Sequence, residues 1–193
     1  MKKKKLIYSL LAGLLLAALI PTAYAFMFRK SQTVNNVFAP AKVTCEVAET
    51  MGTVEQGGKT YDAKTSVKVQ NTGNVEAYIK VQLVVYWQDS KGNVVFRNMD
   101  LTDVQDSIAE GWLSGGNHTY YYTLPIAPGA QTPELLKKPI VMHPVNEPYG
   151  NVDYVYTPVV EIIAEAIQSV PVEAVENSWE VDITGKTITK VLP

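Results

Sequence analysis

Apolar and polar residues alternate along much of the chain, and this period of two constrains the fold more than any other feature of the sequence. Apolar residues occupy every second position from Val43 through Cys45 to Val47, and again at Val67 and Val69. Successive side chains of a β-strand point to opposite faces, so such alternation is typical of strands that bury one face. Helical periodicity is scarce. We therefore expect an all-β protein.

The longest alternating segment, residues 77–87, is expected to be a central strand. Its odd-numbered residues from Ile79 to Val85 are all apolar and would share one face. The turn-forming run Asn71-Thr72-Gly73-Asn74 precedes it. This order predicts a β-hairpin in which residues 77–87 are the second arm and Gly73 has a positive φ.

Residues 154–168 are expected to form the third long strand. Their β-branched residues outweigh the helix preference of the alanines and glutamates in the same segment. These residues are Val155, Thr157, Val159, Val160, Ile162, Ile163 and Ile167. A helix from Val159 onward is the alternative.

Shorter signals complete the predicted fold. Residues 90–93 indicate a turn, residues 102–105 fit a helix-capping box, and Pro171 is placed to start a short helix that reaches Asn177. Residues 179–189 indicate a terminal hairpin or an interrupted strand. The sequence thus predicts a single antiparallel β-sandwich, of jelly-roll or immunoglobulin-like type, with one or two short helices.

The first 25 residues have the three parts of a secretory signal peptide. Lysines at positions 2–5 precede an apolar run over residues 6–20, and Ala23-Tyr24-Ala25 supplies a small-x-small cleavage pattern. The apolar run is shorter than the roughly 20 residues that a membrane-spanning helix needs, and Pro21 interrupts it. We expect signal peptidase to remove this signal helix between Ala25 and Phe26, so the chain meets the membrane only before cleavage.

The chain is accordingly divided into a signal peptide (1–25), an N-terminal extended segment (26–41) and a β-sandwich domain (42–193). About 168 mature residues can bury one core without disulfides. Removal of residues 1–25 takes away four lysines and no acid, so the formal net charge goes from -2 to -6. An acidic domain is a poor partner for nucleic acid. Cys45, the only cysteine, is expected to be a small buried residue.

The sequence carries no motif for catalysis or metal binding. His118 and His143 are its only histidines, and neither belongs to a spacing that holds a metal ion. We therefore expect no enzymatic activity and no cofactor.

Trp112, Tyr120 and Tyr122 are candidates for a surface that stacks on sugars, because aromatic side chains offer flat faces. Neighbouring residues of a strand point to opposite sides, so Tyr121 would face away from Tyr120 and Tyr122. At least one of the three tyrosines would then lie in the core. Packing is the preferred interpretation, and a binding surface is the alternative.

The N-terminal extended segment differs in kind from the rest of the chain. Phe26 and Phe28 follow the cut directly, and a polar stretch separates them from Val37 and Phe38. An extended apolar segment either folds back as the first strand of its own sheet or pairs with the open edge of another molecule. These four residues are therefore the candidate assembly residues.

Three stretches carry a resemblance to a known family. Residues 34–41 read Val-Asn-Asn-Val-Phe-Ala-Pro-Ala, residues 67–81 place Asn71-Thr72-Gly73 before a strand, and residues 111–129 run from Gly-Trp through three tyrosines to Pro-Gly. Here the chain resembles the TasA and camelysin group, exported matrix-fibre and surface proteins of Gram-positive bacteria that a dedicated signal peptidase processes. The resemblance implies secretion, a jelly-roll-like sandwich and a place in the biofilm matrix. The aromatic-Ser-Asp start of TasA is replaced by Phe26-Met27-Phe28-Arg29-Lys30.

Two hypotheses for the function follow. The first is a non-enzymatic secreted structural protein of the bacterial surface or matrix, which assembles by strand addition with itself or with a related fibre subunit. The alternative is a monomeric secreted module that binds cell-wall glycan or a host surface.

Overall fold

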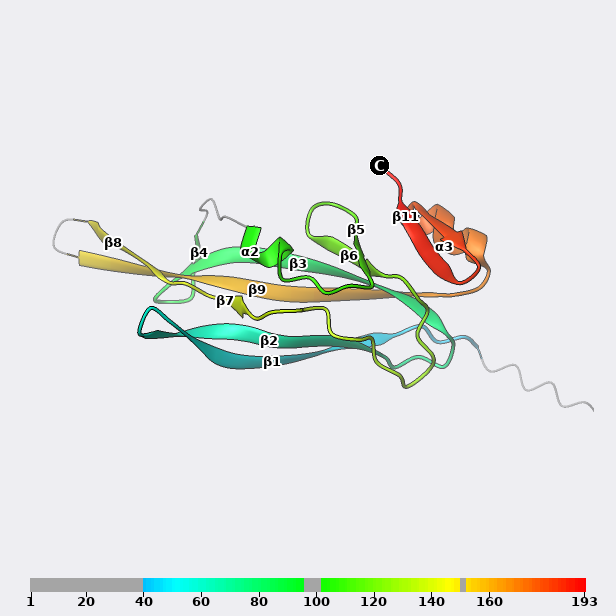
Figure 1. The fold of residues 1–193 in the computed structure, drawn as a ribbon, viewed down its shortest axis with the longest axis horizontal. Coiled ribbons are helices and arrows are strands. Elements are labelled where there is room, and N and C mark those ends of the chain that lie inside the picture. The colour runs from blue at the N-terminus through cyan, green and yellow to red at the C-terminus, as the bar shows by residue number, and fades with distance from the viewer. Residues whose placement is uncertain (1–39, 96–101, 150–151) are drawn as a thin grey trace, which may run out of the picture. The chain divides into compact units, whose positions relative to one another are not determined.

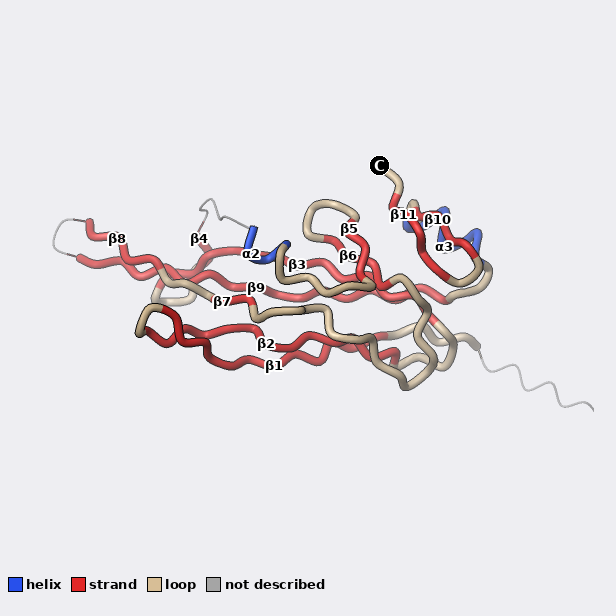
Figure 2. Tube along the Cα trace, in the orientation of Figure 1, coloured by secondary structure: helices blue, strands red, loops and turns tan. Residues whose placement is uncertain are grey.

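Two antiparallel β-sheets face each other in the part of the chain that the structure, a computed structural model, describes (Figure 1). The described residues are 40–95, 102–149 and 152–193. They belong to one unit that begins at Pro40. Strands dominate this unit, and its helices are short (Figure 2). The predicted all-β sandwich is confirmed.

The smaller sheet has the strand order β1-β2-β7. Its strands are β1 (Cys45–Gln56), β2 (Lys59–Asn71) and β7 (Ile140–Val141). Gly57 and Gly58 connect β1 to β2, and both have the positive φ values, 57° and 73°, that favour glycine. The pairing of β1 with β2 shifts register once, between Thr50 and Met51, where Thr65 is the extra residue on β2.

The larger sheet has the strand order β5-β6-β3-β9-β8, with β4 paired to β3 beside this path. Its strands are β3 (Ala77–Asp89), β4 (Val94–Val95), β5 (Trp112–Ser114), β6 (Thr119–Tyr122), β8 (Val145–Tyr149) and β9 (Val152–Gln168). Strand β3 is central, as predicted, and pairs with β9 from Ala77 opposite Gln168 to Asp89 opposite Tyr156. Because β9 is a strand throughout, the alternative of a helix from Val159 is wrong.

The main core fills the space between the two sheets. Val67 and Val69 of β2 meet Ile79, Val81 and Leu83 of β3, and all five are at most 2% exposed. They are alternate residues of their strands, so the period of two in the sequence becomes the two facing surfaces of this core. Cys45 is only half-buried and packs against the edge of the core, so the predicted full burial is not reached.

A second, smaller core covers part of the outer face of the larger sheet. It involves α3 (Val172–Trp179), β10 (Val181–Thr184) and β11 (Thr187–Val191), which follow β9. Tyr78 and Tyr121 of the sheet pack there against Val175, Trp179 and Ile188. The predicted short helix after Pro171 and the terminal hairpin are confirmed. The other short helix, α2 (Thr102–Gln105), lies where the capping box predicted it.

The predicted hairpin between β2 and β3 is wrong, because the two strands belong to different sheets. The buried carboxamide of Asn71 explains this. Its Nδ2 donates to the carbonyl oxygens of Val75 and Ile126, both at 2.8 Å, and its Oδ1 accepts from the Gly73 N–H at 2.9 Å. These bonds fix the connection in a conformation that leads from the smaller sheet to the larger one.

The positive φ predicted for Gly73 is also wrong. Glycine is required at this position because the backbone of Lys42 approaches it closely.

Candidate functional site

Side chains able to bind a metal ion, those of His, Cys, Asp and Glu, do not gather in groups of three or more that could hold one within the described residues. His143 packs edge-on against the ring of Tyr61, with the ring centroids 4.6 Å apart. His118 lies in a different connection, the loop before β6, and its backbone is left-handed with a φ of 57°.

The candidate aromatic surface is not exposed, which corrects the alternative expectation for these residues. Trp112 and Tyr120 are 7% and 4% exposed and lie in the main core between the sheets. Tyr122 packs against the same core, and the centroids of the Tyr122 and Trp112 rings are 5.3 Å apart. Tyr121 points to the opposite face, into the second core. The tyrosine run therefore joins the two cores, as strand geometry predicted for packing residues, and leaves no aromatic platform on this strand.

The residues predicted for cleavage and assembly lie outside the described part of the chain. They are Ala23, Ala25, Phe26, Phe28, Val37 and Phe38. Two features of the described residues are candidates for binding, an open sheet edge and a pocket.

Strand β1 is an open edge of the smaller sheet. It pairs with β2 along one side, and no strand of the described residues pairs with its other side. At twelve residues it is long for an edge strand, since strands usually have 3–10 residues. Such an edge offers backbone donors and acceptors to another extended segment.

The direction of the free groups of β1 follows from the bonds of β2. In an antiparallel pair, residues that exchange backbone hydrogen bonds alternate with residues that do not. Val69 of β2 bonds away from β1, because its C=O accepts from the Thr132 N–H at 2.9 Å and its N–H donates to the Thr132 hydroxyl at 3.0 Å. Val47, which faces Val69, therefore turns its own N–H and C=O outward.

Cys45 and Glu49 repeat this arrangement on either side of Val47. The backbone of Asn71, opposite Cys45, bonds to residues 129 and 130, and that of Val67, opposite Glu49, bonds to residues 134 and 135. Three alternate residues of β1 thus present N–H and C=O groups for which the described residues supply no partner. One added strand could pair with all of them.

The composition of β1 does little to block such pairing. The strand contains neither proline nor lysine, two residues with which natural edge strands prevent it. Its charged residues are Glu46, Glu49 and Glu55, so the edge is acidic. Glu49 forms an ion pair with Lys64, which is buried on β2. Burial lowers the pKa of Lys64, and the charge of Glu161 opposes that shift.

The chain that leads into β1 is fixed to the connection between β2 and β3. The N–H of Lys42 donates to the side-chain oxygen of Asn74 at 2.6 Å, and the side-chain amide of Asn74 donates to the carbonyl of Pro40 at 3.1 Å. The backbone N–H of Thr72 donates to the carbonyl of Thr44 at 2.9 Å. Residues 40–44 are therefore held beside this connection, and any reversal of the preceding segment would have to occur before Pro40.

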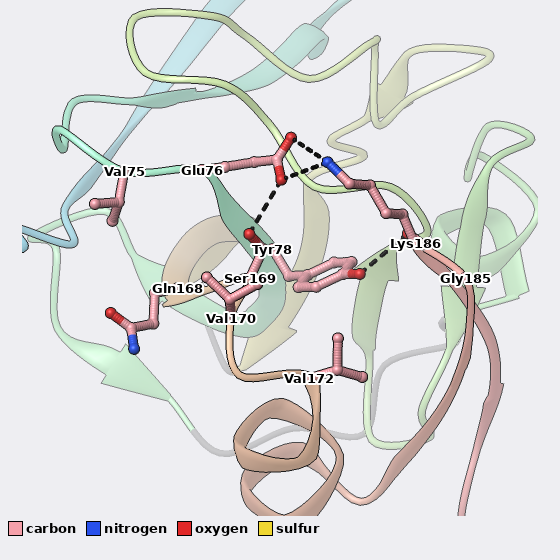
Figure 3. A pocket seen from close by; sticks show the side chains of 9 residues that line it. All are labelled: Val75, Glu76, Tyr78, Gln168, Ser169, Val170, Val172, Gly185 and Lys186. Atoms are coloured by element: carbon pink, nitrogen blue, oxygen red, sulfur yellow. Dashed lines mark hydrogen bonds and ion pairs between the residues drawn. The ribbon is translucent and has the colours of Figure 1, made fainter.

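A pocket of about 470 Å³ lies where β3 begins, β9 ends and the β10–β11 turn approaches them (Figure 3). Its lining residues are Val75, Glu76, Tyr78, Gln168, Ser169, Val170, Val172, Gly185 and Lys186. An ion pair between Glu76 and Lys186 spans the rim at 2.9 Å. Tyr78, only 1% exposed, donates from its hydroxyl to the Lys186 carbonyl at 3.1 Å. These contacts join the C-terminal hairpin to the start of β3.

Glu76 is the charged centre of this pocket. The ammonium of Lys186 lowers the pKa of the Glu76 carboxyl, burial opposes that shift, and a hydrogen bond from Ser169 at 3.1 Å adds to it. Glu76 is therefore ionised at neutral pH. Burial raises the pKa of the Tyr78 phenol, so this hydroxyl stays neutral and remains a donor. The arrangement can bind a cation beside apolar side chains.

Sequence reasoning missed both the pocket and the outward groups of β1. Glu76 and Lys186 are 110 positions apart, and no local pattern connects them. Cys45 and Val47 were placed on one face of a strand, but which edge of that strand stays open depends on pairing. A stronger signal lay in Gly57-Gly58, which follows residues of strand type and could have located the β1–β2 hairpin.

No protein-family model matches this sequence, and neither a curated protein nor a solved structure matches it. Within residues 40–95, 102–149 and 152–193, no helix has the length and apolar character needed to cross a membrane.

Proposed function

We propose that this chain is a non-enzymatic structural protein of the bacterial cell surface or extracellular matrix, exported through its signal peptide. It assembles with copies of itself or with a related fibre subunit by strand addition. The donor is the N-terminal extended segment, residues 26–41, and the acceptor is the open edge of β1 in a neighbouring molecule.

The observation that carries this proposal is the row of outward backbone groups at Cys45, Val47 and Glu49. Unpaired N–H and C=O groups along a sheet edge are a template for an added strand. In strand addition, main-chain hydrogen bonds supply affinity and alternate side chains of the donor supply specificity. Phe26, Phe28, Val37 and Phe38 are the apolar side chains that such a donor would contribute.

The first test compares the secreted protein with a variant that lacks residues 26–36. Both hydrophobic cores lie within the unit that begins at Pro40, so the shortened chain should keep the melting temperature of the parent. Sedimentation velocity should show large species for the parent and a monomer for the deletion. Unfolding of the shortened chain would instead identify the segment as a strand of its own sandwich.

The second test blocks the acceptor. Val47→Pro removes an outward N–H while it leaves the bonds between β1 and β2 in place, and proline is tolerated at such edge positions. Val47→Ala is the matched control, because it shortens the side chain but keeps the N–H. The proposal requires Val47→Pro to lose assembly and Val47→Ala to retain it. Equal assembly by the two variants would show that β1 is not the acceptor.

One observation favours the second candidate function, binding of cell-wall glycan. Tyr154 and Tyr156 on β9 stack with their ring centroids 6.4 Å apart and their planes within 11°, and Tyr154 is 43% exposed. An exposed aromatic ring can stack on the apolar face of a sugar, and the half-buried ring of Tyr156 lies parallel behind the exposed ring of Tyr154. Co-sedimentation with purified cell-wall fragments tests this candidate. Tyr154→Ala should abolish it, whereas Val47→Pro should not affect it.

A further inference from the structure

Lys64 is the one charged residue that is buried within the described ranges 40–95, 102–149 and 152–193, where it is 4% exposed. Lysine is almost never fully buried unless its charge is compensated. By contrast, Lys68, Lys80 and Lys186, which also pair with glutamates, have side chains that are 23–71% exposed. The fold therefore places one amine in the core, and the groups that this amine contacts decide what it can do.

A β-bulge turns the Lys64 side chain toward the core. Thr65 is the extra residue of β2 at the point where its pairing with β1 shifts register. One extra residue reverses the faces to which the side chains beyond it point, so Lys64 lies on the inner face of the sheet. Its partner on β7, Ile140, belongs to the main core, and Glu49 lies on the same face opposite Val67. The bulge thus brings an amine and a carboxylate together on one face.

Two residues of the β1–β2 hairpin hold this bulge in place. The hydroxyl of Thr65 donates to the Thr50 carbonyl at 3.1 Å. Gly52 leaves room for the methyl group of Thr65, since a Cβ at position 52 would lie 2.9 Å from it. Bulges are frequent beside functional sites, where they re-aim a side chain. The local sequence therefore fixes the position of Lys64.

The ammonium of Lys64 contacts a carboxylate oxygen of Glu49. Burial lowers the pKa of Lys64, while the charge of Glu161 on β9 opposes that shift. A charge taken out of water is costly, so a buried pair can neutralise itself by moving one proton from the ammonium to the carboxylate. The neutral amine is a nucleophile, and the carboxylic acid is the group that it can attack. The side chain of Glu49 is 34% exposed, which gives a released water molecule a way out.

We propose that Lys64 and Glu49 join in an intramolecular isopeptide bond, an amide between Nζ of Lys64 and Cδ of Glu49. After proton transfer within the pair, the lone pair of Nζ attacks Cδ and the C–N bond forms. Nζ then gives up a proton to the departing hydroxyl, the C–O bond breaks, and one water molecule leaves. No oxidation state changes, and the condensation needs no co-reactant.

The fold favours both the rate and the equilibrium of this reaction. Two strands hold the reacting groups in contact, and well-oriented groups of one molecule can react as if their concentration were about 10⁵ M or more. The amide also removes two charges from a place where their desolvation is costly. It ties the edge strand β1 covalently to β2, whether or not another molecule adds to that edge. The inference therefore goes beyond the proposed function and does not depend on it.

The test is the intact mass of the purified chain, unfolded before measurement, after N-terminal sequencing has established its first residue. The bond removes one water, so the parent should be about 18 Da lighter than its sequence predicts. Lys64→Arg and Glu49→Ala cannot form the bond and should show the full mass. Their matched controls are Lys68→Arg, on the same strand, and Glu46→Ala, at an exposed position on the other face of β1. Both controls should keep the deficit.

A tryptic digest locates the bond. Trypsin should cut after Lys42, Lys59 and Lys68 but not after Lys64, because an amide removes the charge that trypsin recognises. Peptides 43–59 and 60–68 should then stay joined. Sequencing of this product should release Val43 and Thr60 together in equal amounts, which distinguishes it from an uncut peptide of the same mass.

A parent chain with the full mass would overturn the inference, and this result does not depend on whether any variant folds. A deficit that persists in Lys64→Arg, or a digest that places the missing water elsewhere, would overturn it as well. A mass deficit in a protein that sediments as a monomer contradicts only the proposed assembly. Assembly of a protein with the full mass contradicts only the isopeptide bond.

Discussion

Gly73 lies directly against the backbone of Lys42, and a Cβ at position 73 would collide with the Lys42 carbonyl oxygen. The contact exists because the N–H of Asn74 donates to that same carbonyl at 3.0 Å. The chain that enters β1 therefore packs directly against the connection between β2 and β3. The absence of a side chain at Gly73 is what allows this approach.

We expect Gly73→Ala and Gly73→Val to destabilise the sandwich by about 1–3 kcal/mol, because overpacking forces the backbone apart. Urea unfolding measures the change. Gly58→Ala is an informative comparison, since a Cβ there meets nothing within 4 Å and only the left-handed backbone, φ 73°, opposes it. A fully stable Gly73→Ala variant would show that Lys42 can move aside without cost.

Asn71→Ala should be more damaging. The carboxamide of Asn71 is fully buried and bonds to the Gly73 N–H and to two carbonyl oxygens, those of Val75 and Ile126. Removing it leaves the Gly73 N–H and the Val75 carbonyl without their side-chain partner, whereas the Ile126 carbonyl keeps its bond from the Ala77 N–H. Each buried group left unpaired costs about 1–3 kcal/mol, so we expect a loss of about 2 kcal/mol or more in the free energy of unfolding.

The control for Asn71 is Asn74→Ala. Asn74 also bonds to backbone groups, but it is exposed, so water can replace its bonds to Lys42 and Pro40. Its loss should lower the free energy of unfolding by about 1 kcal/mol or less. Similar losses for the two variants would contradict the role assigned to the buried carboxamide.

Alternation in the sequence predicted the central strand, and the density of β-branched residues predicted the strand that pairs with it. Residues 77–87 and 154–168 became β3 and β9, which pair along the centre of the larger sheet. The predicted turn at residues 71–74 was also real. Its direction was not predictable, because the side chain of Asn71 bonds to Ile126, 55 positions away, and thereby sends the chain into the other sheet.

The candidate sites show the same limit. The tyrosine run 120–122 was correctly expected to contribute to packing, since strand geometry alone separates Tyr121 from its neighbours. The burial of Trp112 depends on the main core and its indole N–H bond to the Glu134 carbonyl at 3.2 Å, which no local pattern indicates. Pairing and long-range contacts decide which aromatic residues remain exposed.

Trp179→Ala should loosen the C-terminal layer before it affects the main core. Trp179 is 5% exposed, and the centroid of its ring lies 5.6 Å from that of Tyr121. Its indole N–H donates to the Glu165 carboxylate at 3.0 Å. Replacing a buried tryptophan by alanine costs about 3–5 kcal/mol. Hydrogen exchange should show faster exchange in β10 and β11 than in β3. Ser178→Ala, at the exposed neighbouring position, should leave exchange unchanged.

Acid should weaken the sandwich partly through Glu134. Burial alone would raise the pKa of this carboxyl, but hydrogen bonds from Ser66, Lys68 and the Val67 N–H lower it below the ordinary value. A carboxyl whose pKa is lower in the folded state contributes stability above its unfolded pKa, about 4.3, and loses it as the pH falls through the folded value. The urea midpoint should therefore fall between about pH 5 and pH 3.

Glu134→Gln separates this contribution from those of other carboxylates. The amide keeps an acceptor for Ser66 but cannot titrate, so the variant should be less stable at pH 7 and should lose less stability on acidification. Parallel pH profiles for the parent and the variant would contradict the assignment. The comparison needs equal ionic strength at each pH, because salt screens the exposed pair with Lys68.

Cys45 should react slowly with thiol reagents in the native protein. Burial raises the pKa of its thiol, and the charge of Glu165 raises it further, so the reactive thiolate is scarce at neutral pH. The side chain is half-buried against the main core, which also restricts a bulky reagent. Labelling should accelerate in urea as the protein unfolds.

Strand addition should slow the native labelling of Cys45 further, because the backbone of Cys45 faces the open edge of β1. Val47→Pro should remove this additional protection and leave the protection by burial unchanged. Native labelling as fast as in urea would contradict the burial of this thiol.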